Sequence, residues 1–139
     1  MHLKTLGNRE HNPKQWGIAF HDEFHAEFQA WTEEVQDALL SQTPKLRLFG
    51  PALGRPTVDT LKGSLYSNMK ELRFEAEGGV WRVAFAFDPK RRAILLCGGS
   101  KTGLSRERFY GILIHTADRR YGTHLAKLAR EQRENDNLT

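Results

Sequence analysis

The sequence has a single cysteine, no long hydrophobic run and none of the short motifs that mark the common enzyme classes. Cys97 cannot form an internal disulfide and lies in an apolar run, which predicts a small buried hydrophobic residue and a reducing, cytoplasmic environment. No segment approaches the roughly 20 apolar residues of a membrane span, and residues 1–16 lack the apolar stretch of a signal peptide. We therefore expect a soluble protein with no membrane partner.

The missing motifs exclude several kinds of catalysis. The chain has no CxxC pair, no HExxH and no GxSxG. Residues 98–103, GGSKTG, resemble a phosphate-binding loop but lack its spacing and follow a predicted antiparallel strand, so we interpret them as a flexible turn. His21 and His25 stand four residues apart without further ligands, which predicts neither a metal nor a cofactor. His115 and His124 fall outside the apolar stripe of the last predicted helix, and we expect both to be exposed.

Length and charge indicate one small basic domain. The chain has 139 residues, of which 39% are apolar, enough for one ordinary core. Its 21 Lys and Arg residues exceed its 17 Asp and Glu residues, giving a net charge of +4. This balance favours nucleic acid or an acidic protein as the partner.

The N-terminal half predicts a strand followed by helices. The apolar, aromatic residues 16–21 read as a strand, and Asp22 stands where a helix N-cap is expected. An apolar stripe then follows helical spacing, and residues 22–42 form one helix or two, because Thr32 can cap a second. Pro44 predicts either a kink or a new short helix.

Three strands follow a loop over residues 51–60. They are predicted at residues 69–75, 80–88 and 93–97, and the turns between them are too short for a helical crossover. Consecutive strands should therefore be antiparallel.

The chain ends in a helix. Ser105 is its expected N-cap, and Gly122 marks a place where it can bend. We expect a loose lead-in over residues 1–15, one domain over 16–128 and a polar, frayed tail over 129–139. An amphipathic helix should cover one face of the sheet, leaving the other face or an edge for function.

Positive charge is concentrated on that sheet and just after it. Strand alternation places Arg73 on one face with Glu71 and Glu75, and places Arg82 on the same side of the next strand. The two arginines either share one phosphate by bidentate hydrogen bonding or pair with the glutamates. Further candidates for a nucleic-acid phosphate site lie where the last helix begins: Arg106, Arg108 and Tyr110.

These residues resemble a known family. The segments LKGSL, ELRF and VWRVAFAFDPKRRAILLCGGSKTG, with the FY that opens the last helix, resemble the RelE/ParE superfamily of toxins, in its phage-derived Gp49-like, HigB-type branch. The similarity covers residues 16–128. It implies an α+β fold, with a small mostly antiparallel sheet of about four strands packed on two N-terminal helices, and a C-terminal helix. It also implies a type II toxin-antitoxin pair, in which a helix-turn-helix antitoxin forms a hetero-oligomer with the toxin.

RelE-like members cut messenger RNA on the ribosome, so the resemblance implies an endoribonuclease that inhibits translation. Arg73 and Arg82 would stabilise the transition-state charge, and Tyr110 would stack on or orient the nucleotide. The general base stays open among Glu71 and the lysines Lys62, Lys70 and Lys101. The implied catalytic set is Arg73, Arg82, Lys101, Arg108, Tyr110 and Glu71, and the implied RNA-binding set is Lys62, Lys70 and Arg106.

Two other functions fit the same family. A ParE-like protein would bind DNA gyrase without chemistry, and a catalytically silent relative would act only in an antitoxin-DNA repressor complex. The arginines on the sheet favour the ribonuclease, because an inhibitor that works by protein contact has no need for convergent phosphate-binding cations.

Overall fold

The sheet has six strands in the order β1-β2-β6-β5-β4-β3. The computed structural model describes residues 4–5 and 15–138. The strands are β1 (Lys4–Thr5), β2 (Gly17–Phe20), β3 (Val58–Thr60), β4 (Lys70–Ala76), β5 (Gly79–Phe87) and β6 (Arg92–Ser100). All neighbours are antiparallel except β2 and β6, which are parallel. The mostly antiparallel α+β class is thus confirmed, but the sheet is larger than the expected four strands.

Two of the strands are short edge strands that the sequence did not indicate. β1 lies inside the expected N-terminal lead-in, the rest of which falls outside the described residues. β3 lies inside the expected loop at residues 51–60 and pairs with β4. Strands of two and three residues are too short to show an alternation of apolar and polar side chains, so only the pairing reveals them.

The N-terminal half contains three helices, which is one of the alternatives that the sequence left open, whereas the family resemblance implied two. They are α1 (Asp22–Gln29), α2 (Glu33–Leu40) and α3 (Thr43–Phe49), followed by the short 3-10 helix η1 (Gly50–Ala52). Thr32 caps α2 by accepting from the Val35 amide, so the alternative of a second helix after Thr32 is confirmed. Pro44 lies at the start of α3, so the alternative of a new short helix is confirmed as well. The N-cap of α1 is His21 and not Asp22, because the His21 Nδ1 accepts from the Glu23 amide.

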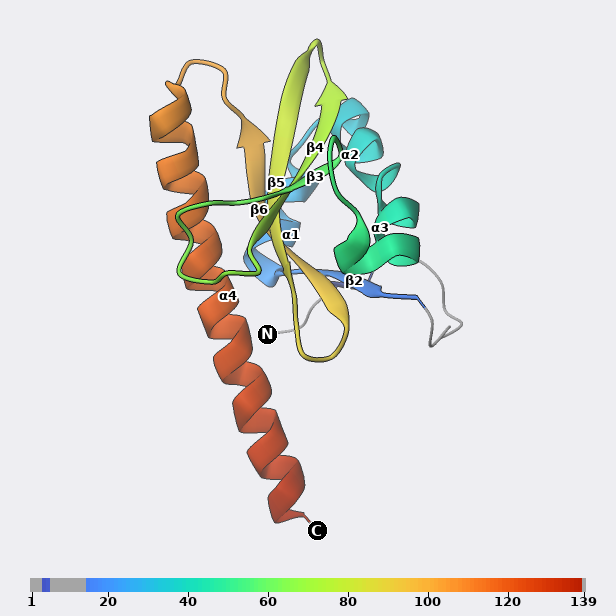
Figure 1. Cartoon of the computed structure of the whole chain (residues 1–139), viewed down its shortest axis with the longest axis vertical. Coiled ribbons are helices and arrows are strands. Elements are labelled where there is room, and N and C mark those ends of the chain that lie inside the picture. Colours follow the sequence, from blue (N-terminus) through green and yellow to red (C-terminus); the bar gives the residue numbers. More distant parts are fainter. Residues whose placement is uncertain (1–3, 6–14, 139) are drawn as a thin grey trace.

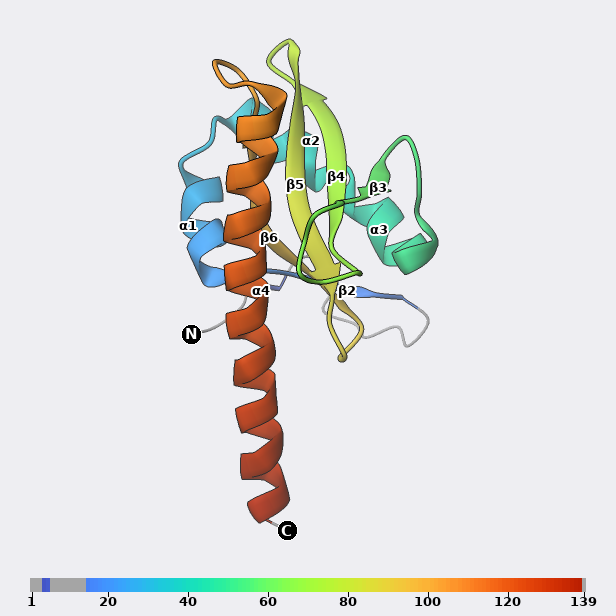
Figure 2. The same ribbon diagram turned by 60° about the vertical axis from the view of Figure 1, so that its left-hand side comes forward.

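Helices cover both faces of the sheet (Figure 1). On one face, α1, α2 and α3 pack against the side chains of Phe20, Leu72, Phe85 and Leu95. On the other, α4 (Arg106–Asn137) packs through Phe109, Leu113 and Ala117 on alternate residues of the same strands. The sequence left the other face or an edge of the sheet for function. Because helices lie against both faces, the other face is not wholly open (Figure 2).

The last helix is continuous through Gly122, where the sequence allowed a bend. A Cβ on Gly122 would stand 2.8 Å from the Tyr66 hydroxyl, so the glycine lets the loop before β4 cross the helix closely. α4 also runs through the expected tail to Asn137, and its final turns project beyond the sheet (Figure 1). Pairs such as Lys127 with Glu131 at 3.9 Å support these exposed turns.

Buried polar groups fasten α4 to the sheet. His124 was expected to be exposed, but it is buried, and its Nε2 lies 2.9 Å from Asp88 Oδ2. Asp88 also accepts from Arg92, and these hydrogen bonds lower the pKa of Asp88 although burial acts in the opposite direction. The sequence prediction took only the apolar residues of the helix as buried. It therefore missed His124, which is buried because it hydrogen-bonds to the Asp88 carboxylate.

Cys97 is the small buried residue that the sequence predicted. It is 5% exposed, and its thiol donates to the Leu113 carbonyl at 3.4 Å. Burial raises the pKa of the Cys97 thiol to about 12. None of the helices described here is long and apolar enough to cross a membrane.

Candidate functional site

The two arginines on which the sequence interpretation rests are direct partners in the β4–β5 ladder. Arg73 pairs with Arg82 in register, and both project toward the α4 side of the sheet. Glu71 lies on the same face of β4, two residues earlier. Strand alternation thus placed three charged side chains on one face, where the beginning of α4 meets them.

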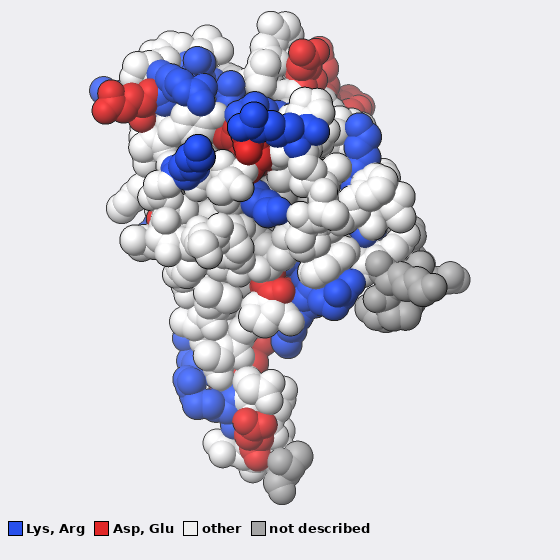
Figure 3. All heavy atoms as spheres, in the orientation of Figure 1, with Lys and Arg blue, Asp and Glu red and all other residues white. Residues whose placement is uncertain are grey.

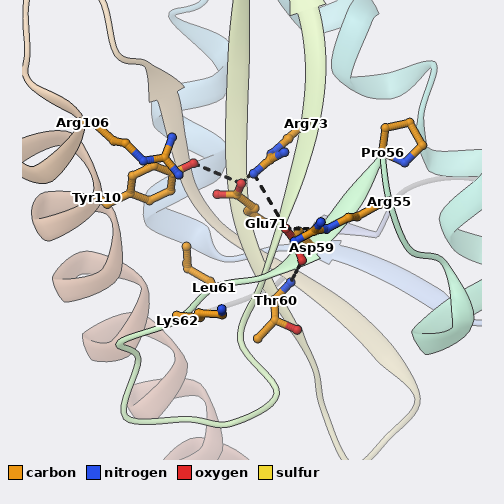
Figure 4. Close-up of a pocket in the computed structure, with 10 residues that line it drawn as sticks. All are labelled: Arg55, Pro56, Asp59, Thr60, Leu61, Lys62, Glu71, Arg73, Arg106 and Tyr110. Atoms are coloured by element: carbon orange, nitrogen blue, oxygen red, sulfur yellow. Dashed lines mark hydrogen bonds and ion pairs between the residues drawn. The ribbon is translucent and has the colours of Figure 1, made fainter.

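Glu71 is the centre of this group. Its residue is 1% exposed, and its Oε1 accepts from Arg73 Nε at 2.6 Å and from the Tyr110 hydroxyl at 3.1 Å (Figure 4). Its Oε2 is buried without a hydrogen-bond partner. A buried carboxylate oxygen without a donor carries an energetic cost, and such atoms are frequently reserved for a ligand or for chemistry.

The two arginines have different surroundings. Arg73 forms the ion pair with Glu71 that the sequence left open, whereas no carboxylate of the described residues forms an ion pair with Arg82. The Arg82 guanidinium lies 5.8 Å from the ring centres of both Phe109 and Tyr110, and its Nε is buried without a partner. Stacking on aromatic rings holds an arginine in place without neutralising its charge.

Glu71, Arg73 and Tyr110 line a pocket of about 460 Å³ (Figure 4). Four cationic side chains face two carboxylates around it, and Lys and Arg surround acidic groups on this face of the molecule (Figure 3). The full lining is Arg55, Pro56, Asp59, Thr60, Leu61, Lys62, Glu71, Arg73, Arg106 and Tyr110. The excess of positive charge favours an anionic ligand.

The charges in the pocket set the protonation of its polar groups. Burial, followed by the hydrogen bond to Glu71, raises the pKa of Tyr110, so its hydroxyl stays a proton donor at neutral pH. The hydrogen bond to Glu71 raises the pKa of Arg73. The Thr60 amide, together with Arg55, lowers the pKa of Asp59, which also lies 3.9 Å from Arg73.

Arg106 and Arg82 approach Tyr110 from different elements. The Arg106 guanidinium stands 4.9 Å from the centre of the Tyr110 ring, and Arg106 belongs to the first turn of α4, which Ser105 caps by accepting from the Arg108 amide. The predicted N-cap at Ser105 is confirmed. It fixes the first turn of α4 and with it the positions of Arg106 and Tyr110.

Not every predicted residue lies in this pocket. Lys62 and Arg106 line it, while Arg82 and Lys101 line a neighbouring hollow of about 430 Å³ with Val80 and Thr102. Lys70 points to the opposite side of the sheet, where its Nζ donates to the Pro51 carbonyl at 3.0 Å. Arg108 is exposed and lines neither hollow.

The sequence interpretation missed one wall of the pocket. Arg55 and Asp59 belong to the segment expected to be a plain loop, and they form an ion pair at 3.1 Å. No sequence signal joins this segment to Glu71, because the contact depends on β3 pairing with β4. Among the described residues, no group of three His, Cys, Asp or Glu side chains is placed to hold a metal ion.

Comparisons of the sequence with known proteins show which family this chain is similar to. A model of the family described as "Phage derived protein Gp49-like" matches residues 26–122. The Mycobacterium tuberculosis protein named "Putative toxin HigB2" is 48% identical over 95 residues, which are 68% of this chain and 47% of that protein. "Putative toxin HigB3" of the same organism is 47% identical over 94 residues, which are 66% of this chain and 80% of that protein.

The chain therefore spans about half the length of the first relative and most of the second. No solved structure matches it significantly. A mixed sheet with helices on both faces and a cationic pocket around a buried carboxylate defines a small α+β protein with a polar site. The chain belongs to the Gp49-like family, the HigB-type branch of the RelE/ParE toxin-antitoxin superfamily.

Proposed function

We propose that this protein is the toxin of a type II toxin-antitoxin pair and that it cleaves messenger RNA on the ribosome. The observation that carries the proposal is the buried Glu71 carboxylate, which lies in the wall of the cationic pocket and has one oxygen without a hydrogen-bond partner. Family membership and the names of the two relatives support the toxin assignment. The chemistry of the pocket supports the ribonuclease.

In the proposed reaction, the ribose 2′-hydroxyl attacks the adjacent phosphorus while the Glu71 carboxylate takes its proton. The new O2′–P bond forms as the P–O5′ bond breaks, so the products are a 2′,3′-cyclic phosphate and a 5′-hydroxyl. Lys62 supplies the proton to the leaving oxygen, because it is the lysine that lines the pocket. A general base and a general acid each contribute about 10²–10⁴-fold to such a step.

The arginines stabilise the phosphorane-like transition state, which carries two negative charges. Arg73 is held in place by its hydrogen bond to Glu71, and Arg82 is held by the rings of Phe109 and Tyr110. Guanidinium groups fixed before the reaction need no reorganisation as the charge develops. Tyr110 donates to Glu71 in the free protein and is proposed to stack on or orient a base.

The remaining predicted residues take outer positions in this proposal. Arg106 and Lys101 lie at the rims of the two hollows, where they would contact neighbouring phosphates. Contacts from Lys70 and Arg108 to RNA stay predictions, since both side chains lie outside the hollows. The partners are then messenger RNA, the ribosome and a helix-turn-helix antitoxin, all in the cytoplasm.

Expression in a bacterial host, followed by primer extension on translated messages, tests the proposal. The parent chain should produce new cleavage ends, and Arg82→Ala should not. Arg133→Ala is the matched control, because it removes an exposed arginine from the last turns of α4, which project beyond the sheet. Growth arrest with intact messages and damaged DNA would instead indicate a gyrase inhibitor, and the absence of any toxicity would indicate a silent relative.

A further inference from the structure

The loop between β3 and β4 lies across α4 and carries the lysine of the Glu71 pocket (Figure 1). We call residues 61–69 the crossing loop. Its two ends are joined, because the Leu61 amide donates to the Met69 carbonyl at 3.0 Å. Compact surface loops whose ends meet are frequently functional. This loop begins in the wall of the pocket, which both Leu61 and Lys62 line (Figure 4).

The side chain of Lys62 has no contact of its own to hold it in place. It is exposed, and no hydrogen bond or ion pair joins it to a described residue. A lysine ammonium stands on a flexible four-carbon stem, so its position depends strongly on the backbone that carries it. The contacts of the neighbouring residues therefore decide where the proposed proton donor stands.

Asp118 of α4 fixes the loop just after that lysine. Its Oδ1 accepts from the Ser64 hydroxyl, and its Oδ2 accepts from the Leu65 amide at 3.0 Å. The Ser64 oxygen in turn accepts from the Tyr66 amide at 3.0 Å. Hydrogen bonds to a carboxylate are roughly twice as strong as those between neutral groups. Asp118 thus clamps three consecutive residues of the crossing loop to the helix.

Two further features set the path of the backbone through Lys62. On one side, Leu61 is 5% exposed and belongs to the apolar cluster between the sheet and α4. On the other side, Gly63 has a φ of 97°, which glycine adopts readily and other residues rarely do. Lys62 therefore lies between a buried leucine and a turn that Asp118 closes.

The far half of the crossing loop has anchors of its own. Tyr66 packs edge-on against Tyr121 of α4 with ring centres 4.9 Å apart. Asn68 Nδ2 donates to the Phe87 carbonyl at 3.1 Å. Neither contact involves Asp118, so the loop should stay on α4 when that residue is replaced. The first half, which carries the lysine, should then loosen alone.

We propose that Asp118 is a positioning residue for the ribonuclease, because it holds the crossing loop so that the Lys62 ammonium reaches the leaving oxygen. The same helix carries Tyr110, so the clamp also fixes the lysine relative to the tyrosine wall of the pocket. This role rests on the function proposed above, and Asp118 itself does not line the pocket. A displacement of about 1 Å in a catalytic group can cost about 10²-fold in rate.

Hydrogen exchange followed by nuclear magnetic resonance tests the clamp without reference to catalysis. Asp118→Ala should speed exchange of the Leu65 and Tyr66 amides about tenfold or more and leave the amides of β5 unchanged. Ser64→Ala breaks the clamp from the loop side and should act in the same direction. Glu134→Ala is the control, because it removes an exposed acid from the last turns of the same helix. Equal exchange in Asp118→Ala and the parent would overturn the inference, whether or not the protein cleaves RNA.

The rate of message cleavage on translating ribosomes tests what the clamp does. Asp118→Ala should cut about 10²-fold more slowly than the parent, whereas Glu134→Ala should match the parent. In a double-mutant cycle, Asp118→Ala should add no further loss to Lys62→Ala, because the lysine that it positions is already gone. A general loss of structure would instead slow cleavage by the same factor with and without the lysine.

The outcomes separate this role from the ribonuclease itself. Full activity of Asp118→Ala with a loosened loop would overturn the inference and leave the proposed function intact. Additive losses in the double-mutant cycle would do the same, since Asp118 would then act on something other than Lys62. Absence of cleavage by the parent chain would refute the proposed function, and the positioning role would fall with it.

Discussion

Gly98 and Gly99 are adjacent glycines for which the structure predicts opposite responses to alanine. A Cβ on Gly98 would stand 2.8 Å from the Arg82 carbonyl oxygen and 2.8 Å from Val83 Cγ2, and 3.2 Å from Trp31. Backbone and β-branched atoms cannot move aside cheaply, so Gly98→Ala forces the two strands apart. A Cβ on Gly99 would instead meet one ring atom at an ordinary 3.9 Å.

The magnitude follows from the packing. Inserting a methyl group into a filled space costs about 1–3 kcal/mol. A chain of 139 residues has an unfolding entropy of about 0.3 kcal/mol/K, so Gly98→Ala should lower Tm by about 3–10 °C. Gly99→Ala should leave Tm unchanged or raise it slightly, because alanine restricts the unfolded chain by about 0.4–1 kcal/mol.

Thermal unfolding followed by circular dichroism measures both variants against the parent. The strain in Gly98→Ala acts on the Arg82 backbone, so this variant should also cleave messages less well than Gly99→Ala. A Tm of Gly98→Ala equal to that of the parent, or an equal fall of Tm in the two variants, would contradict this prediction. It would return these glycines to the flexible turn that the sequence suggested, whereas the structure places both inside β6.

Three further predictions concern buried groups. Burial lowers the pKa of His21 from its ordinary value of 6.5, so on acidification the unfolded chain protonates this histidine before the folded chain does. The free energy of unfolding measured in urea should therefore fall as the pH drops from about 7 to 5. A free energy that does not change over this range would contradict the prediction. Because Cys97 is buried with its pKa raised to about 12, a maleimide should label it at about pH 8 only in the denatured chain, and rapid native labelling would show an open core. Arg120→Met removes the hydrogen bonds to Glu27 and to the Leu96 carbonyl and should destabilise the fold by about 1–3 kcal/mol. The loss is smaller than for a fully buried ion pair, because Glu27 is half exposed. An unchanged urea midpoint would show that these Arg120 contacts do not stabilise the fold.

Local patterns in the sequence predicted much of this fold. Thr32 and Ser105 were candidate caps, because a hydroxyl just before a helical stripe can accept a hydrogen bond from a free amide of the first helical turn. Strand alternation predicted that Arg73 and Arg82 lie on the same face of the sheet. The short turn between β4 and β5 sets the register that makes these two arginines cross-strand partners. These features depend on residues close together in the chain.

What the sequence could not supply are the contacts between distant segments. His124 is buried because Asp88, 36 residues earlier, satisfies it. Arg55 and Asp59 reach the pocket only through the β3–β4 pairing. Lys70 shares the basic strand with Arg73 but faces the other way. Helices on both faces of the sheet likewise depend on how α4 returns across it.

A single variant, Glu71→Gln, tests most directly whether Glu71 is the general base. Glu71→Gln keeps the size and the hydrogen-bonding oxygen of the side chain but removes its capacity to take a proton at neutral pH. The variant should fold, because Arg73 Nε and the Tyr110 hydroxyl can still donate to the amide oxygen. Its Tm is measured beside that of the parent, so that cleavage is compared between folded proteins.

The measurement is the rate at which parent and Glu71→Gln cleave a message on translating ribosomes, with the new ends analysed for 2′,3′-cyclic phosphate. We predict cyclic phosphate ends from the parent and a rate about 10²–10⁴-fold lower for the folded variant. Cleavage by Glu71→Gln at the parent's rate would contradict the assignment of the pocket's chemistry to this carboxylate.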